Sequence, residues 1–385
     1  RMKSISIKSS VRGPIRGLFS RLGSYLWPAL AAAAGLQLLC SCSGCSLGVY
    51  TVPTPREISI LSYNVQNLFD DVHDGSEYYD YDPYGDEWNS ELFHLKLLQL
   101  SDVLNRYPQG GADILLLQEV ENINALQTLV SYYLKGCGYH YSAVSGGNES
   151  AVNTAVLSRY PIETLRAHSV SLDGSIAGRP ILECSISVGD HLLRLFNCHW
   201  KSKSGGAAET EAMRRAAAAV LSGRVREIVR QHPESALIIA GDLNECIDEW
   251  QSIEGSYLMA LLPADQYTDL VPEERRRSIG VTGDPGAAQL GDEHVILVSP
   301  WLDASRINSD QLAGSYAFRG EWETIDHFLL CPSLYDGRGF EFEAFRVISN
   351  KALLNNEGYP LRWISDLGTG YSDHLPILLR CRLEP

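Results

Sequence analysis

Eight polar side chains interrupt or end apolar runs of the sequence, and all are of types that bind a hard metal ion or transfer protons. They are Asn64, Glu119, His199, Asp242, Asn244, Asp326, Asp373 and His374. Burying a charge is costly unless the charge is paired or bound to a metal, and Mg²⁺ prefers oxygen ligands. A single Asp or Asn at the end of a strand is more often a turn former or a cap. Because the eight residues come from six separate segments, the whole set indicates a hard-cation site with catalytic capacity.

The apolar runs that carry these residues alternate with helix-like segments from residue 57 onward. We expect strands at 58–65, 112–120, 153–158, 180–188, 191–200, 235–243, 324–331 and 375–381. Helical spacing of apolar residues predicts helices at about 89–106, 122–135 and 207–231. The alternation indicates a layered α/β fold, and the continuous apolar runs indicate strands that are buried on both faces.

The polar residues fall within six short motifs. In chain order these are YNVQN, QEVEN, HWKSKSGG, GDLN, IDH and SDHLP. Over residues 57–385 this order resembles the endonuclease/exonuclease/phosphatase superfamily, and most closely its bacterial secreted form with YNxxNLFD, QEVEN and HWKSKxGG. The resemblance implies a four-layer α/β sandwich, in which two packed mixed β-sheets are flanked by helices and the site lies at one end.

The resemblance also implies a metal site built from oxygen ligands. Glu119 is expected to be the principal Mg²⁺ ligand, with Asn64 beside it in contact with metal or phosphate. Asp373 is expected to be a further ligand, and Mn²⁺ is expected to substitute for Mg²⁺. The resemblance leaves open whether one metal ion or two take part.

Catalytic roles follow from the same resemblance. Asp242 would position or deprotonate the attacking water, and Asn244 would hold that water and a phosphate oxygen. His199 and His374 would donate to the phosphoryl oxygens as negative charge builds up. Asp326 would orient the His374 ring and favour its imidazolium form. The identity of the general base stays open.

Two Asp-His pairs look alike in the sequence, but strand geometry predicts different roles for them. Adjacent side chains of a regular strand point to opposite faces, so only one of Asp326 and His327 can face the site. The family pattern selects Asp326 and leaves His327 as a packing residue. Asp373 and His374 stand at a loop-to-strand junction after Gly370, where both side chains can reach the site.

Asn153 and Lys201 are the expected substrate-binding residues. Asn153 opens the run 153–158 and either contacts phosphate or is a structural residue at the strand entrance. Lys201 either holds a phosphate oxygen or is solvated in its loop. The aromatic segment YAFRGEW at 316–322 likewise either presents side chains to a substrate or packs within a loop.

The first 41 residues differ in kind from the rest of the chain. They begin with a segment that holds six Lys or Arg and no acid, followed by an apolar stretch of signal-peptide length. Leu39 lies three residues before Cys42, and a serine directly precedes that cysteine, as in a lipoprotein processing site. We expect residues 1–41 to be a lipoprotein signal peptide, Cys42 to be lipidated, 42–56 to be a tether and 57–385 to be the catalytic domain. Plain signal cleavage and an uncleaved anchor are the alternatives.

The net charge and the N-terminal segment limit which partners and which location can be expected. Without residues 1–41 the chain has 26 basic and 47 acidic side chains, a formal charge of −21. Such a surface argues against tight non-specific nucleic-acid binding through a basic face, but it allows a phosphate substrate whose charge a metal meets locally. We expect a monomeric, exported bacterial lipoprotein that is anchored to the membrane on the periplasmic or cell-surface side.

The segment 70–87 holds eight acids in eighteen positions. Asp80, Asp82, Gly85 and Glu91 match a calcium-loop template at its first, third, sixth and twelfth positions. Tyr84 breaks the fifth position, and no strong entering helix precedes the loop. A solvated loop near the site is the favoured interpretation.

We therefore expect a Mg²⁺-dependent phosphodiester hydrolase in which water attacks phosphorus in line. DNA or RNA is the expected substrate, because the chain most resembles extracellular nucleases. A phospholipid head group, as in sphingomyelinases, or another phosphoester is the alternative. A non-catalytic binding lipoprotein is less favoured, because a decayed enzyme would be expected to lack at least one of the eight site residues.

Overall fold

The computed structural model describes residues 3–4, 55–146, 150–303 and 313–384. The described residues all belong to one compact unit. Cys42, nearly all of the predicted signal peptide and most of the predicted tether lie outside the described residues. Within the described part of the chain, no helix is long and apolar enough to cross a bilayer.

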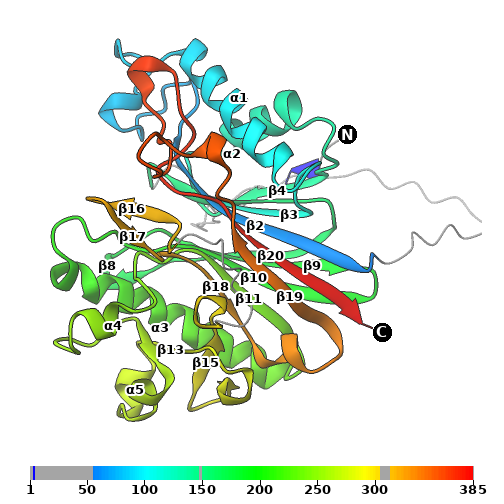
Figure 1. Ribbon diagram of the computed structural model, residues 1–385, viewed down its shortest axis with the longest axis vertical. Coiled ribbons are helices and arrows are strands. Elements are labelled where there is room, and N and C mark those ends of the chain that lie inside the picture. Colours follow the sequence, from blue (N-terminus) through cyan, green and yellow to red (C-terminus); the bar gives the residue numbers. More distant parts are fainter. Residues whose placement is uncertain (1–2, 5–54, 147–149, 304–312, 385) are drawn as a thin grey trace, which may run out of the picture. The chain divides into compact units, whose positions relative to one another are not determined.

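Two mixed β-sheets form the centre of this unit (Figure 1). The first sheet has the order β1 (Lys3–Ser4), β4 (Tyr141–Val144), β5 (Asn153–Ser158), β3 (Ile114–Val120), β2 (Glu57–Leu68), β20 (Ile377–Glu384) and β19 (Gly339–Val347). Its β2–β3 and β1–β4 pairs are parallel, and its other pairs are antiparallel.

The second sheet is also mixed. Its order is β12 (Leu261–Pro263), β13 (Ile279–Thr282), β15 (Val295–Val298), β18 (Asp326–Leu330), β11 (Ala236–Asp242), β10 (His191–His199), β9 (Ile181–Val188) and β6 (Ile162–His168), and β14 (Gln289–Leu290) pairs with β15. The pairs β10–β11, β12–β13 and β13–β15 are parallel. Two short hairpins stand apart from the sheets, β7 (Ser171–Leu172) with β8 (Ser175–Ile176) and β16 (Tyr316–Phe318) with β17 (Glu321–Glu323).

Helices cover the outer faces of both sheets, so that the fold has four layers (Figure 1). On the first sheet lie α1 (Ser90–Arg106), α2 (Ile123–Thr128) and the π-helical turn η2 (Leu129–Tyr133), and on the second lies α3 (Ala207–Gln231). The remaining helical segments are short: α4 (Glu249–Ser252), α5 (Ala264–Thr268), α6 (Pro272–Arg275), η1 (Tyr79–Tyr81), η3 (Pro285–Ala287), η4 (Pro300–Leu302), η5 (Pro332–Tyr335), η6 (Lys351–Leu353) and η7 (Ser365–Leu367). Asn89 caps α1 by accepting the Leu92 N–H. The predicted α/β sandwich is confirmed.

The inner faces of the sheets make the main core. Ile114 to Leu117 of β3 are all fully buried, as the continuous apolar run predicts. One polar pair crosses between the sheets here, because Gln118 Nε2 donates to Asn197 Oδ1 at 2.7 Å. Asn197 Nδ2 also donates to two backbone carbonyls, so both groups of the Asn197 amide are hydrogen-bonded in the apolar surroundings.

All eight predicted strands and all three predicted helical segments are present, with ends shifted by a few residues. The segment 122–135 divides into α2 and η2. The sequence reasoning missed several strands, among them β6 and β19. No residue of β6 is fully buried, and in β19 buried residues alternate with more exposed ones and the ladder contains a bulge. These strands therefore lack the continuous apolar signal of the central strands.

Candidate metal-assisted catalytic site

The register of the central strands brings the polar side chains together. His199 of β10 is paired with Asp242 of β11, and Asp242 is paired with Asp326 of β18. Such partners lie on the same face of a sheet, with Cβ atoms about 4.5–5.5 Å apart. From the first sheet, Asn64 Nδ2 donates to Asp242 Oδ2 at 3.1 Å. The two sheets are therefore joined by a hydrogen bond at the site itself.

Glu119 is held by an irregular turn of β3. Its φ of +64° lies in the left-handed region, and the ladder between β3 and β5 shifts register at this point. Such backbone costs about 1–3 kcal/mol in a non-glycine residue. The carboxylate is fixed at both oxygens, because Oε1 accepts Asn64 Nδ2 at 3.0 Å and Oε2 accepts the Asn67 N–H at 2.9 Å. The bulge thus turns Glu119 toward the site.

Gln66 is a site-forming residue that the sequence reasoning missed. Its Oε1 accepts the backbone N–H groups of Trp363 and Asp373 at 2.8 and 2.9 Å, and its Nε2 donates to Trp363 O. Ser372 Oγ adds a bond of 2.7 Å to Asn64 O. These bonds fix the loop from which Asp373 projects. The sequence does contain this residue as the glutamine of YNVQN. Its role could not be predicted, because its partner Trp363 lies 297 residues away along the chain.

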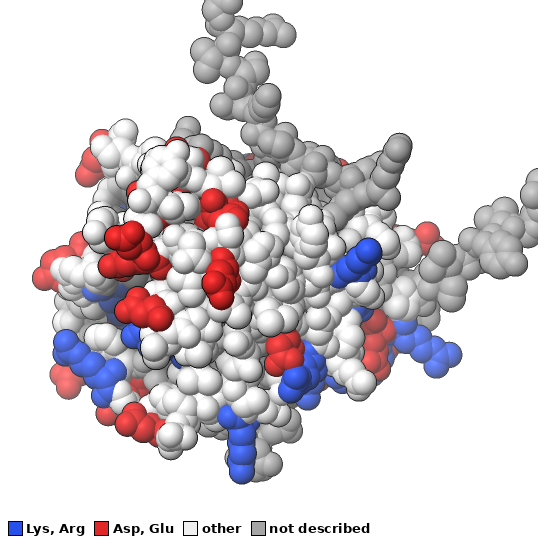
Figure 2. All heavy atoms as spheres, turned by 90° about the horizontal axis from the view of Figure 1, so that it is seen from above, with Lys and Arg blue, Asp and Glu red and all other residues white. Residues whose placement is uncertain are grey.

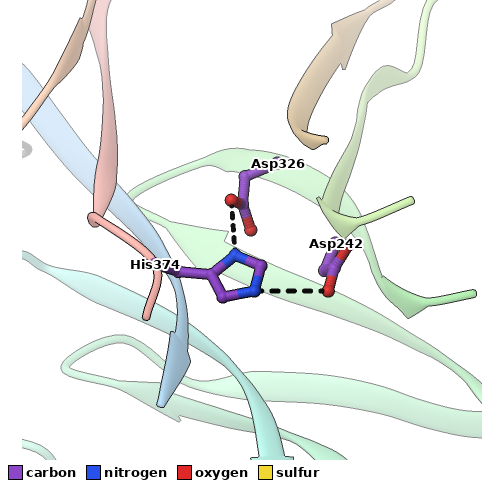
Figure 3. A group of neighbouring side chains, drawn as sticks. All are labelled: Asp242, Asp326 and His374. Atoms are coloured by element: carbon purple, nitrogen blue, oxygen red, sulfur yellow. Dashed lines mark hydrogen bonds and ion pairs between the residues drawn. The ribbon is translucent and has the colours of Figure 1, made fainter. Parts of the chain in front are cut away.

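Asp326, His374 and Asp242 form a row in which the imidazole stands between two carboxylates (Figure 3). His374 Nδ1 lies 2.8 Å from Asp326 Oδ2, and Nε2 lies 3.9 Å from Asp242 Oδ2. Ser315 Oγ donates to the same Asp326 oxygen at 2.6 Å. Burial disfavours charge on the ring, but the carboxylates outweigh it and raise the pKa of His374 to about 10. The ring is therefore an imidazolium at neutral pH, and the predicted Asp326–His374 contact is present.

His199 has the opposite electrostatic character. Its Nε2 lies 3.7 Å from Glu119 Oε1 and 3.6 Å from Asp242 Oδ2, while Nδ1 is buried without a partner among the described residues. Burial, followed by the charges of Arg179 and His374, lowers the pKa of His199 well below its usual value. The site thus combines a neutral with a charged imidazole. Distances of 3.6–3.9 Å are too long for hydrogen bonds, so a phosphoryl oxygen or a water could bridge these groups.

The GDLN motif places Asp242 by backbone constraints. Gly241 has a φ of +126°, and a Cβ there would collide with the Cys198 carbonyl, so only glycine allows this close approach of β11 to β10. The N–H of Asn244 donates to Asp242 Oδ1 at 3.0 Å. Burial raises the pKa of Asp242 to about 7, although His374 opposes the shift. A carboxyl group that titrates near neutral pH is suited to proton transfer.

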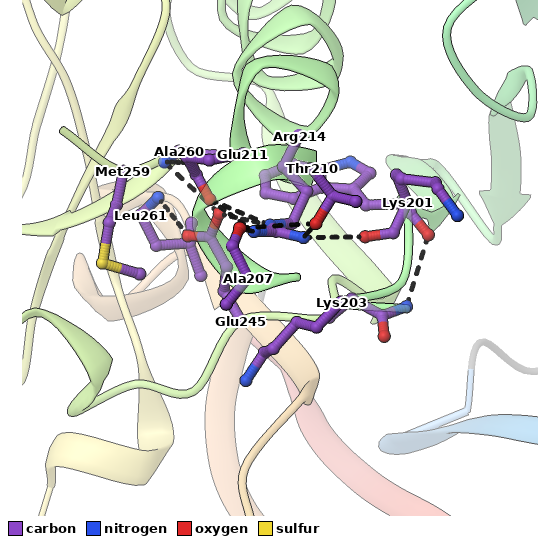
Figure 4. Close-up of polar contacts among 12 residues, drawn as sticks. Lys201, Lys203, Ala207, Thr210, Glu211, Arg214, Glu245, Met259, Ala260 and Leu261 are labelled. Carbon is purple, nitrogen blue, oxygen red and sulfur yellow. Dashed lines mark hydrogen bonds and ion pairs between the residues drawn. The ribbon is translucent and has the colours of Figure 1, made fainter. Parts of the chain in front are cut away.

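A buried charge network anchors the loop 200–206 (Figure 4). Arg214 of α3 is fully buried and pairs with Glu211 at 2.7 Å and with Glu245 at 3.1 Å. Its Nη1 also donates to the Lys201 carbonyl at 3.2 Å. Glu245 directly follows the GDLN motif, so the network ties the loop after β10 to the end of β11. Breaking a buried pair of this kind costs about 3–5 kcal/mol.

A cavity of about 580 Å³ opens over this arrangement. Its walls include six of the eight predicted residues, namely Glu119, His199, Asp242, Asn244, Asp373 and His374, together with Arg179, Lys203, Tyr316 and Phe318. The other two predicted residues, Asn64 and Asp326, are buried and bond to the residues that line it. The structure therefore brings the whole predicted set into one site.

The two predicted substrate-binding residues are not among those that line this cavity. Asn153 is buried and donates to Glu121 O at 2.6 Å. Lys201 bonds to Arg214 through its backbone carbonyl. Their contacts with a substrate stay predictions. Lys203 does line the cavity, but its Nζ pairs with Glu249 and Glu323 at 2.8 and 3.4 Å.

The carboxylates of Glu119 and Asp373 fit a hard cation. Both line the cavity, the Glu119 side chain is 19% exposed, and the Asp373 carboxylate accepts no hydrogen bond from the residues that the structure describes. Asn64 turns its amide nitrogen toward Glu119, and its Oδ1 accepts the Gln66 N–H at 3.0 Å. In this orientation Asn64 positions a ligand, and its own contact with metal or phosphate stays a prediction.

Asp242, Asp326 and His374 also offer three potential ligand atoms within 4.8 Å of one another. Both ring nitrogens of His374, however, already face carboxylates. Hydrogen bonding and ion pairing therefore account for this group, and the more exposed carboxylates of Glu119 and Asp373 remain for a metal.

Comparison with known proteins gives a family-level result. A family model described as "Endonuclease/Exonuclease/phosphatase family" matches residues 59–257, whereas no curated protein matches significantly. A solved endonuclease/exonuclease/phosphatase family protein from Bacteroides thetaiotaomicron is 15% identical, with a TM-score of 0.50, over 86% of this chain and 98% of that one. TDP2 from Caenorhabditis elegans has 18% identity and a TM-score of 0.49 over 85% and 74% of the two chains. The human Nocturnin catalytic domain is 13% identical, with a TM-score of 0.47, over 85% of this chain and 94% of that one.

We expect His374→Ala to lower kcat for phosphodiester hydrolysis by about 10²–10³-fold, because it removes the charged donor next to Asp242. His327→Phe is the matched control, because His327 is buried and bonds to Glu245 O at 2.7 Å. It should lower stability but leave kcat of the folded protein within about threefold. Steady-state rates with bis(p-nitrophenyl) phosphate and thermal melts check both. Equal losses of kcat in the two folded variants would contradict these roles.

Proposed function

This chain belongs to the endonuclease/exonuclease/phosphatase family, and from that premise we propose that it is a Mg²⁺-dependent nuclease. It is an enzyme, a metal-dependent phosphoesterase that hydrolyses phosphodiesters. The proposal adds the identity of the metal and the class of substrate. It rests on the acidic, oxygen-rich cavity and on the aromatic hairpin that borders it.

Glu119 and Asp373 would hold the metal. Both ligands are carboxylates, and the described lining of the cavity offers no cysteine, so a hard ion such as Mg²⁺ or Mn²⁺ suits it better than a thiophilic one. When bound, such an ion neutralises phosphate charge and polarises a phosphoryl oxygen. Asn64 and the Asn67 N–H hold Glu119 in place before any metal binds.

The residues around the metal ligands account for the other requirements of in-line hydrolysis. A water oxygen forms the new bond to phosphorus, and its proton passes to Asp242, which the Asn244 N–H orients. The bond to the leaving oxygen breaks on the opposite side, and solvent protonates that oxygen. The His374 imidazolium and the Nε2–H of His199 donate to phosphoryl oxygens as charge builds up.

The β16–β17 hairpin supports a nucleic-acid substrate. Tyr316 packs on the His374 ring with 4.7 Å between centroids, and Phe318, two residues on, is 49% exposed. Both rings line the catalytic cavity and also a neighbouring cavity of about 330 Å³. An exposed ring next to a phosphate site suits base stacking, which contributes about 1–3 kcal/mol per base.

Cationic side chains lie beside these rings. Arg319 and Arg362 line the neighbouring cavity, and Arg179 lines the catalytic one. Across the face drawn in Figure 2, the visible Lys and Arg are scattered and form no continuous basic surface. A short single-stranded segment, contacted only around the site, fits this distribution better than a long duplex held by its backbone.

EDTA should abolish hydrolysis of single-stranded DNA, and added Mg²⁺ should restore it. Glu119→Gln, which removes the charge and keeps the shape, should lower kcat/KM by about 10²-fold or more and raise the Mg²⁺ concentration for half-maximal rate. Glu323→Gln is the control, because this acid lines the cavity but pairs with Lys203. Titration of rate against Mg²⁺ checks this. Full activity in EDTA, or in Glu119→Gln, would rule out the metal mechanism.

Phe318→Ala should raise KM for single-stranded DNA by about 5–100-fold, because a stacking surface is lost. The rate with bis(p-nitrophenyl) phosphate, which has no base, should not change. Tyr132→Ala is the control, because Tyr132 is 76% exposed and does not line either cavity. Parallel assays with sphingomyelin vesicles and an inositol polyphosphate separate the alternatives. Faster turnover of either one than of DNA would show that the substrate class is wrong.

We also propose, from the sequence alone, that the enzyme is exported and anchored through Cys42. In a bacterial host, Cys42→Ala should move the protein from the membrane fraction to the soluble fraction and abolish labelling by a fatty acid. Cys45→Ala, three residues further on, should leave both unchanged. Membrane release by Cys45→Ala, or membrane association that survives Cys42→Ala, would contradict this assignment.

A further inference from the structure

A second group of acids lies outside the catalytic cavity. The segment between β2 and α1 packs against the end of β3, and carboxylate oxygens of Asp74, Glu77 and Glu121 come within 4.8 Å of one another. Figure 2 shows acidic side chains gathered toward the left of its face, on the side where Figure 1 places this segment. None of the three acids lines the catalytic cavity.

Glu121 gives an observation that is independent of this clustering. The residue is 2% exposed, and its Oε2 accepts the Asp70 N–H at 2.7 Å. Its Oε1 is buried and has no hydrogen-bond partner among the described residues. An unsatisfied buried carboxylate oxygen is costly. A cation bound beside Asp74 and Glu77 would satisfy it.

The loop itself turns Glu77 inward. Its side chain is only 2% exposed, and its carboxylate accepts the N–H groups of Asp74 and of Gly75, the latter at 2.8 Å. His73 is the basic side chain nearest to it, with Nδ1 3.6 Å from Glu77 Oε2 and 2.9 Å from Asp82 Oδ1. Among the described residues, no Lys or Arg forms an ion pair with the three acids. Backbone N–H groups of residues 74–76, the Ser76 hydroxyl and His73 meet part of the charge of Asp74 and Glu77, and no described Lys or Arg pairs with it.

Neighbouring groups hold the cluster in place without filling it. Both oxygens of the Asp70 carboxylate are satisfied, because Oδ2 accepts the amides of Asn122 and Asn124 and Oδ1 accepts the Val72 N–H. Trp88 Nε1 donates to Asp70 O at 2.7 Å. Glu121 thus stands on an ordered framework, whereas Asp74 lies on an exposed part of the loop.

We propose that Asp74, Glu77 and Glu121 bind a calcium-like divalent cation that is distinct from the catalytic metal. The ligands are all oxygens on an irregular loop, which suits Ca²⁺ better than Zn²⁺ or Cu²⁺. Opposite ligands of one Ca²⁺ are up to roughly 5 Å apart, so a spread within 4.8 Å fits a single ion. Asp80, Asp82 and Glu91, which match the calcium-loop template, are not part of this cluster.

The proposed ion would brace the segments that hold Glu119. Glu121 lies two residues beyond it, directly after the end of β3, and the Glu121 N–H donates to Leu68 O at 2.9 Å. On the other segment, Asn67 donates to Glu119 itself. The inference does not depend on the proposed nuclease activity, because it concerns a separate set of side chains.

Terbium luminescence tests the site on the full chain, since Tb³⁺ mimics Ca²⁺ and Trp88 lies close enough to sensitise it. The background protein for this test carries both Glu119→Ala and Asp373→Ala, so that the proposed ligands of the catalytic metal are absent. We expect one sensitised Tb³⁺ that Ca²⁺ displaces. Adding Glu121→Gln or Asp74→Asn should weaken binding by at least about tenfold, whereas Asp80→Asn should not.

Thermal melts give a readout that does not depend on luminescence or on activity. Ca²⁺ should raise the Tm of the background protein and of Asp80→Asn but not that of Glu121→Gln. In EDTA, Glu121→Gln should fold and melt at or above the background protein, because it replaces a buried carboxyl group whose Oε1 has no partner. Equal Tb³⁺ affinity and an equal Ca²⁺ shift in Glu121→Gln, or no bound Tb³⁺ in the background protein, would overturn the proposal.

Discussion

A carboxylate buried between two packed sheets is costly, and Asp242 is such a group. Its cost is offset by an amide from the opposite sheet, by the charged His374 imidazolium and by the backbone N–H of Asn244. The partners of Asp242 are themselves held by carboxylates. Asp326 bonds to His374, and Glu119 accepts a hydrogen bond from the Asn64 amide. The constellation therefore follows from the need to compensate one buried charge from both sheets.

The supporting network also gives the two imidazoles different charges. His374 lies between carboxylates and is protonated, whereas His199 lies near positive charge in a buried position and is neutral. A phosphoryl group between them would meet two N–H donors, only one of which carries a full charge. Because the donors are fixed before a substrate arrives, little reorganisation is needed as negative charge develops.

Backbone strain is concentrated in the same motifs. Among the described residues, seven non-glycine positions have left-handed backbone, and four of them, Gln66, Asn67, Glu119 and Asn244, belong to YNVQN, QEVEN and GDLN. Gln66, Asn67 and Glu119 interrupt their strands where these reach the site, and Asn244 follows the end of β11. The strain is maintained because hydrogen bonds hold the side chains of Gln66, Glu119 and Asn244 and the backbone N–H of Asn67. The proposed calcium site would reinforce the segments that carry three of these residues.

The sequence by itself determined the alternation of elements, the central strands and the eight polar residues, because apolar periodicity and interrupted strands are local signals. Alternation along a strand, which is local too, showed that only one of Asp326 and His327 can face the site, and the resemblance to the family selected Asp326. Only the tertiary structure revealed Gln66, the orientation of the Asn64 amide, the pairing of Lys203 and the meeting of Glu77 with Glu121. These depend on which distant segments pack together, and no local pattern records a partner on another element of the fold.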